Sequence, residues 1–178
     1  MADTYPSRPI TIVVPYGAGG TNDILARALA AGMSPLLGQS VIVSNRPGAG
    51  GNLGAAYVAN AAPDGYTLLL ASSGVFAINK WLYRDLPYDP SRLTPVMLAG
   101  KVPNVLLASP TLPVNTEKEL IEYAKAHPGK LNFASMGTGT SGHLMSELFK
   151  QDAGIQAQHV PYKGSTAALT DSSAARSS

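Results

Sequence analysis

Three loops rich in Gly, Ser and Thr carry the groups in this sequence that could bind an anion. They span residues 16–21, 72–74 and 136–141, and each follows an apolar run typical of a strand. Glycine lets backbone N–H groups approach a ligand closely, and a helix that starts after such a loop adds free N–H donors and a positive dipole end. The pattern favours an anion held without Lys or Arg, against the simpler interpretation that each glycine cluster is a tight turn.

The third loop also matches the dinucleotide-binding fingerprint. Residues 137–142 read G-x-G-x-x-G between a predicted strand and a predicted helix. That fingerprint requires an acidic residue about 20 positions further on, at the end of the next strand. Residues 156–161 contain no acid, and no Walker-type phosphate-binding motif occurs. A nucleotide-dependent enzyme is therefore the weaker hypothesis, and we predict no cofactor.

Residues that could perform catalysis or bind a metal are few. The chain has no cysteine, and His127, His143 and His159 lack the spacing of metal ligands. Asp23 sits where a helix dipole favours a negative charge, so a role at a helix start is favoured over a catalytic acid. His143 opens a helix beside the third loop and contacts either the ligand or its own surroundings. We predict that the chain is not an enzyme and binds no metal.

The elements that must position these loops alternate between strands and helices. Apolar runs predict strands over 9–15, 41–43 and 66–71, and periodic segments predict helices over 21–33 and 52–62. This order is typical of a parallel sheet covered by helices, in which ligands bind beyond the carboxyl ends of the strands. The three loops are therefore expected to face the same way.

A second set of elements lies around and after a predicted crossover at residues 100–103, with one strand expected on each side of it. Thr116 and Glu119 have the spacing of a capping box, which predicts a helix start there. The further expected elements are strands over 96–98, 105–108, 131–135 and 156–160 and helices over 116–126 and 142–152.

Composition narrows the class of protein. Hydrophobic residues make up 45% of the 178 residues and charged residues 13%, about half the usual share, so the chain can bury a core. The net charge is +2 without a basic run, which argues against nucleic acid as a partner. No stretch is long and apolar enough to span a membrane. Residues 1–4 do not resemble a signal peptide, and residues 172–178 resemble a tail or cloning scar.

Several motifs together resemble one family. The sequence is similar to the Bug receptors, the periplasmic solute-binding components of tripartite tricarboxylate transporters, and its motifs occur in the same order as in that family. The resemblance covers residues 5 to about 171. The motifs that carry it are Tyr5–Pro15 with Gly17–Asp23, Asn45–Gly51, Ala62–Leu69, Ser135–Leu144 and Val160–Gly164.

The resemblance implies an α/β fold of the two-lobed, Venus-flytrap type. Residues 4–100 would form the first lobe and residues 101–171 part of the second, with a hinge near residues 100–103. Family members are markedly longer, and their chain returns to finish the first lobe, so the C-terminal part of the fold would be missing here. The implied function is capture of a small carboxylate in the periplasm for the membrane subunits of the transporter. The carboxylate would be a dicarboxylate, a tricarboxylate, an amino acid or an aromatic acid.

The resemblance also implies which residues bind the ligand. Two loops, residues 16–23 and 135–143, would hold one ligand carboxylate, largely through backbone amides and ordered water, and two serines would contribute from the side. We call residues 16–23 the first loop and residues 135–143 the second loop. The implied ligand-binding residues are Tyr16, Gly17, Ala18, Gly19, Gly20, Thr21, Asn22, Asp23, Ser72, Ser73, Ser135, Gly137, Thr138, Gly139, Thr140, Ser141 and His143.

An alternative follows from the short length. A truncated chain would expose apolar faces and strand edges, which favour association with another chain. The protein would then be a fragment that binds no ligand, or a domain-swapped assembly.

Overall fold

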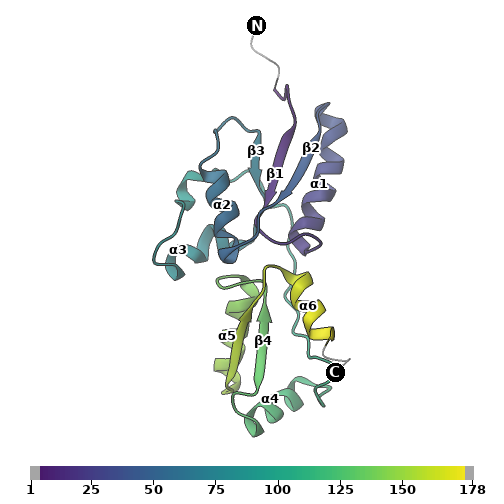
Figure 1. Cartoon of the computed structure of the whole chain (residues 1–178), viewed down its shortest axis with the longest axis vertical. Helices are drawn as coiled ribbons and strands as arrows, with labels where there is room; N and C mark the ends of the chain where they lie inside the picture. The colour runs from purple at the N-terminus through teal and green to yellow at the C-terminus, as the bar shows by residue number, and fades with distance from the viewer. Residues whose placement is uncertain (1–4, 175–178) are drawn as a thin grey trace.

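The computed structural model describes residues 5–174 and places them in two lobes, each built on a parallel sheet (Figure 1). The upper lobe contains the three-stranded sheet, with strand order β2-β1-β3, and the lower lobe contains the two-stranded sheet β4-β5. This architecture confirms the predicted α/β class. None of the helices among the described residues is long and apolar enough to cross a membrane.

The upper lobe contains most of the elements expected before residue 100. Its first loop joins β1 to α1, and a glycine-rich turn joins β2 to α2. The elements are β1 (Ile10–Val14), α1 (Thr21–Leu37), β2 (Val41–Asn45), η1 (Ala49–Gly51), α2 (Asn52–Ala59), β3 (Thr67–Leu69), η2 (Gly74–Ile78), α3 (Asn79–Leu82) and η3 (Pro90–Arg92).

The central strand β1 explains the continuous apolar run in the sequence. It pairs in parallel with β2 on one side and β3 on the other, and helices lie on both faces of the sheet (Figure 1). A strand covered on both faces has no solvent-facing side, so it does not alternate between apolar and polar residues. Ile12 and Val14 pack with Ala26 and Ala30 of α1, which anchors that helix directly behind the first loop.

Helix α1 continues beyond its expected end at residue 33. It runs to Leu37 with Pro35 in its last turn, and ends where Gly38 adopts a left-handed conformation with φ of 64°. Glycine adopts this conformation without a Cβ clash, so it ends helices readily. The glycine therefore sets the boundary, and the proline does not.

The lower lobe follows the sequence expectations closely. The burial of β4 alternates between buried and exposed residues, as expected for a strand with one face on a core. That face packs against α4 through Leu120, Ala124, Leu131 and Phe133. The elements are α4 (Glu117–Ala126), β4 (Leu131–Ser135), α5 (Ser141–Ala153), β5 (Ala157–Pro161) and α6 (Ser165–Ala174).

The capping box predicted for α4 is confirmed. The Glu119 backbone N–H donates to Thr116 Oγ1 at 3.2 Å, and Glu119 Oε2 accepts from the Asn115 N–H at 2.6 Å. The helix ends at His127, as its sequence neighbours indicate. Local side-chain chemistry is enough to place this helix.

The strands predicted over residues 96–98 and 105–108 are wrong for this structure. Residues 94–109, which we call the linking segment, contain no helix or strand. Val96 is 82% exposed and Val105 73% exposed. A strand needs a neighbour to take its backbone hydrogen bonds, and no described strand pairs with these residues.

The end of the described chain also differs from the expectation. Residues 172–174, predicted to belong to a tail, are the last turn of α6, a helix that the sequence did not indicate. The rest of the predicted tail, residues 175–178, lies outside the described residues, as do residues 1–4.

A long trough with a volume of about 1980 Å³ runs along the linking segment and touches both lobes. We call it the trough. Its lining is mostly apolar, and Arg92 is the one charged side chain among the described residues that line it. The lobe boundary and hinge predicted near residue 100 fall inside the linking segment and stay predictions.

Candidate ligand-binding site

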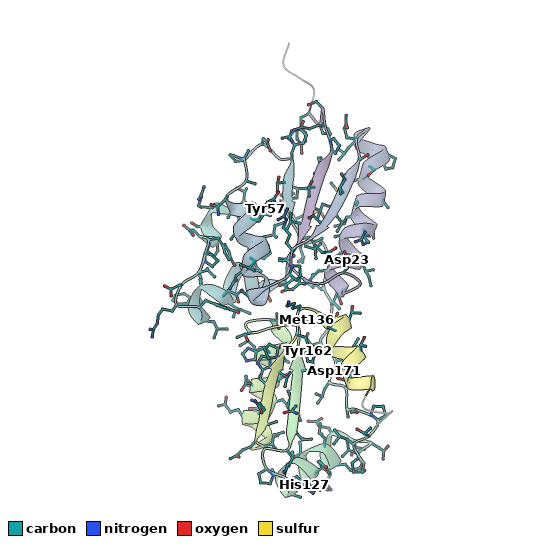
Figure 2. All side chains as sticks on the ribbon, viewed as in Figure 1. Asp23, Tyr57, His127, Met136, Tyr162 and Asp171 are labelled. Atoms are coloured by element: carbon teal, nitrogen blue, oxygen red, sulfur yellow. The ribbon has the colours of Figure 1, made fainter. Side chains whose placement is uncertain are left out.

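The first and second loops both lie where the two lobes meet, and each contacts a different segment of the opposite lobe. The first loop contacts Lys163 and Thr166, and the second loop contacts Gly50 and Gly74. Each loop follows the carboxyl end of a strand, β1 or β4, and leads into a helix, α1 or α5. Figure 2 shows Asp23 at the lower end of the upper lobe and Met136 at the top of the lower lobe. The parallel sheets therefore place both candidate loops at the junction of the two lobes.

A buried carboxylate holds the first loop in shape. Asp23 is 3% exposed and accepts hydrogen bonds from the Gly19 N–H at 2.9 Å, Arg27 Nε at 2.9 Å and Asn45 Nδ2 at 3.0 Å. The hydrogen bond from Arg27 is the main reason that the pKa of Asp23 falls to about 2. Asp23 is thus ionised at neutral pH, and its oxygen atoms are already used by the protein.

The start of α1 has free hydrogen-bond donors. Its N-cap is Gly20, and no described side chain caps the helix. The first backbone N–H groups of a helix have no partner within the helix, and the positive end of the helix dipole lies beside them. The side chains of Thr21 and Asn22 line the trough at this point. The first turn of α1 can therefore donate hydrogen bonds to an anion.

Tyr16 connects the first loop to the serines after β3. Its side chain is 4% exposed, and its hydroxyl lies 2.6 Å from Ser72 Oγ. Burial is the main cause that raises the pKa of Tyr16. Ser72 and Ser73 both line the trough. Tyr16 thus supports Ser72 from within the core.

Neutral groups hold the second loop. Ser135 Oγ accepts from the Gly137 N–H at 3.1 Å and lies 2.7 Å from His159 Nε2. Thr140 Oγ1 donates to the Gly137 carbonyl at 2.7 Å and accepts from the His143 N–H at 3.5 Å, so it caps α5. Unlike α1, helix α5 begins with its capping site occupied by its own chain.

Two histidines pack together behind the second loop. The rings of His143 and His159 have centroids 4.0 Å apart. His143 Nδ1 accepts from the Gly139 N–H at 3.3 Å, and Nε2 lies 3.7 Å from a Glu147 carboxylate oxygen. Burial, followed by the nearby His143, lowers the pKa of His159. His143 therefore contacts its own loop and helix here, and contact with a ligand stays a prediction.

The glycine N–H groups of both loops mostly have protein partners. Gly17 donates to the Lys163 carbonyl at 2.9 Å. The Gly19 N–H donates to the Asp23 carboxylate. The Gly137 N–H donates to Ser135 Oγ, and the Gly139 N–H donates to His143 Nδ1. These glycines shape the loops in this structure. The first turn of α1 and the hydroxyl groups around it are what the site offers to a ligand.

The candidate residues fall into three groups by position. Those that line the trough are Thr21, Asn22, Ser72, Ser73, Ser135 and Ser141. Gly17 and Ala18 line a smaller hollow of about 670 Å³ beside Lys163 and Gly164. The others support the loops, and they are Tyr16, Gly19, Gly20, Asp23, Gly137, Thr138, Gly139, Thr140 and His143.

Contacts between the lobes involve residues that sequence reasoning did not assign to the site. Tyr83 donates from its hydroxyl to the Thr138 carbonyl at 2.9 Å, and Thr166 Oγ1 donates to the Ala18 carbonyl at 3.5 Å. Lys163 and Thr166 flank the start of α6. The sequence there is a predicted strand followed by Gly164 and Ser165, a pattern that could have pointed to these two residues. No local pattern marks Tyr83. Among the described residues, no cluster of acidic and histidine side chains is arranged to hold a metal ion.

Two α/β lobes joined through the linking segment, with a trough that touches both, have the architecture of a solute-binding protein, because ligand sites form preferentially between domains. The model of the tripartite tricarboxylate transporter family receptor matches residues 25–177. The chain belongs to this family, which confirms the resemblance seen in the sequence. It is 44% identical over 172 residues to protein BugT of Bordetella pertussis, covering 96% of this chain and 53% of BugT.

Solved structures share the same fold. Rpa4515 of R. palustris, solved with adipate, has a TM-score of 0.90 and 43% identity, covering 94% of this chain and 56% of that one. MatC of Rhodopseudomonas palustris, solved with bound malate, has a TM-score of 0.87 and 36% identity, covering 93% and 57%. The chain thus spans about half the length of the relatives it matches.

Proposed function

We propose that this chain is part of a periplasmic receptor that captures a small dicarboxylate for a tripartite transporter. The observation that carries the proposal is the uncapped start of α1, which lines the same trough as Ser135 and Ser141 of the other lobe. Support comes from the structures solved with adipate and with malate, which share this fold.

The structure suggests how a carboxylate would be held. One carboxylate accepts hydrogen bonds from the N–H groups in the first turn of α1, where the helix dipole stabilises negative charge. The hydroxyls of Thr21, Ser72 and Ser73 lie along the trough and supply further donors. Backbone and hydroxyl donors bind an anion without the desolvation of a buried Lys or Arg.

A thermal-shift series on the full chain tests the proposal. The acids are adipate, malate, citrate, glutamate and benzoate, and the matched control for adipate is its neutral diamide. Adipate or malate at about 100 times Kd adds about 2.7 kcal/mol to the free energy of unfolding, which raises Tm by several degrees. The diamide leaves Tm unchanged. An unchanged Tm with all five acids would refute carboxylate capture.

A charge placed at the helix start locates the site. Asn22→Asp adds a carboxylate to the first turn of α1, where the dipole tolerates it but the ligand is repelled. We expect adipate affinity to fall roughly tenfold or more. Asn115→Asp adds the same charge before α4, at a residue that does not itself line the trough and that lies in the other lobe from the start of α1, and leaves affinity unchanged. Equal affinities in both variants would place the carboxylate elsewhere.

The receptor role also predicts that the ligand is not altered. The proton NMR spectrum of adipate after a long incubation with the chain should be identical to that of the starting material. Titration with NAD(H) or flavin should give no fluorescence change, since the fingerprint at residues 137–142 lacks its acidic partner. Turnover of any ligand would favour an enzyme instead.

A second outcome is the association of two copies of this chain through the linking segment, and it has support of its own. Met97, Val102 and Leu107 are exposed and line the trough together with residues of β3 and β4, and each of these two strands is at the edge of its sheet. Such edges favour pairing with another chain. Light scattering combined with adipate titration distinguishes the outcomes. A dimer that does not respond to adipate would indicate an assembly without binding activity.

A further inference from the structure

The tip of the second loop rests on a seat in the upper lobe that is built from small residues. Gly50 faces the Thr138 carbonyl, and Gly74 faces the Gly139 carbonyl. A Cβ at position 74 would lie 2.7 Å from the Gly139 oxygen, closer than real Cβ atoms approach. The two lobes therefore meet backbone to backbone, and the tip can sit this low only because the seat has no side chain there.

Gly74 differs from the other glycines at this contact. Gly50 and Gly139 have φ of 62° and 85°, so any side chain there would strain the backbone wherever the lobes lie. Gly74 opens η2 and is not among the glycines with positive φ. A side chain at position 74 is therefore acceptable to its own lobe, and the obstacle is the backbone of the opposite lobe.

The seat is also rigid. Asn52 and Asn79 are fully buried behind it, with Asn79 Nδ2 2.5 Å from Asn52 Oδ1. The Tyr88 hydroxyl donates to the Val75 carbonyl at 2.7 Å, which fixes the residue next to Gly74. A well-packed, hydrogen-bonded region does not absorb an added methyl group without strain. An added side chain would therefore push the second loop away.

We propose that Gly74 is a positioning residue of the site, because its missing side chain lets the second loop close onto the upper lobe. This inference rests on the proposed function, in which a ligand binds between the first and second loops. Closure brings the second loop, with Ser135 and Ser141, onto the lobe that carries the start of α1, and both serines line the same trough as that helix start. A side chain at position 74 holds these groups apart without touching the ligand.

The test compares Gly74→Ala and Gly74→Val with Gly32→Val. Gly32 is an exposed residue of α1, and a Cβ there would have no atom within 4 Å, so this control carries the same chemical change without a facing lobe. We expect the Gly74→Val chain to bind adipate roughly tenfold more weakly than the control, and Gly74→Ala to lie between. Without ligand, the Gly74→Ala chain should still unfold cooperatively in urea, which would show that its own lobe accepts the added side chain.

A second measurement reads closure without any ligand. The chain has no cysteine, so Ala18→Cys with Thr166→Cys provides a single reporter pair across the two lobes. Under mild oxidation, the reporter disulfide should form roughly tenfold more slowly with Gly74→Val than with Gly32→Val. If the Gly74→Val chain does not fold, the Gly74→Ala chain provides the test. Its reporter disulfide should also form more slowly than with Gly32→Val, by a smaller factor.

The outcomes separate the two proposals. Equal disulfide rates in the Gly74 and Gly32 variants would overturn the positioning role. Equal adipate affinities, in a chain whose wild type binds adipate, would overturn it as well. A wild type that binds no acid but still shows slower cross-linking with Gly74→Val would contradict the proposed function and support the positioning role.

Discussion

The first and second loops occupy equivalent places in the two lobes but are held by different chemistry. In the first loop a buried carboxylate, Asp23, connects the loop backbone to Arg27 and Asn45. In the second loop, hydroxyl and imidazole groups of Ser135, Thr140 and His159 have that role. One loop depends on a charge and the other on neutral hydrogen bonds.

This difference determines what each loop can offer. Asp23 supports the first loop from the side, so the start of α1 needs no cap and keeps its N–H donors. Thr140 caps α5 by accepting from the His143 N–H, so one donor in the first turn of that helix is already used by its own chain. We therefore expect an anion to be attracted mainly by the first loop. The second loop would contribute hydroxyl groups and shape the wall of the site.

The largest expected effect comes from removing the charge in the first loop. Asp23→Asn leaves Arg27 without its ionic partner, and we expect the free energy of unfolding at pH 7 to fall by about 1–2 kcal/mol, since solvent screens the exposed guanidinium. Urea unfolding measures it, with Asp85→Asn, an exposed residue, as the control. Equal midpoints for the two variants would show that the charge does not stabilise the loop.

The same carboxylate has a defined pH dependence. Its pKa is lowered from 3.8 to about 2 in the folded chain, so the folded state binds fewer protons than the unfolded state between these values. The stabilisation is complete above pH 3.8 and is lost as the pH falls towards 2. Wild type and Asp23→Asn should therefore converge in stability only in strong acid.

A smaller effect is expected in the second loop. Thr140→Ala removes the cap of α5 and the hydrogen bond to Gly137, which should cost about 1 kcal/mol in the free energy of unfolding. Thr116→Ala removes the exposed cap of α4 in the same lobe and should cost about 0.5–1 kcal/mol. Thr140→Ser should restore most of the loss. A larger loss for Thr116→Ala would contradict the importance of the buried cap.

The smallest expected effect comes from His159, and it appears only in how the free energy of unfolding changes with pH. Its pKa is lowered in the folded chain, so the stability it provides is present above pH 6.5 and falls as the pH drops below that value. His143, Glu147 and Lys150 are the charged groups that act on it. His159→Gln keeps a polar side chain that does not titrate. Urea midpoints at pH 7.5 and 5.5 should differ more for wild type than for this variant.

Much of the fold could be predicted from local patterns. Strand β4 spans the predicted residues, and Thr116 and Thr140 cap the helices at the places where short-range chemistry puts them. The linking segment could not be predicted in this way. Its apolar runs are typical of strands, but a strand forms only when another supplies the matching hydrogen bonds, and no described strand does so.

The amino-acid sequence alone determined which residues form the two loops, because glycine content, apolar runs and helix starts are properties of neighbouring residues. The contacts that hold the loops in place are set by the tertiary structure. It placed His159 against Ser135, the Lys163 carbonyl on Gly17, and Gly74 beneath Gly139. These pairs are far apart in the chain, and their contacts depend on how the two sheets bring the strand ends together, which no local pattern contains.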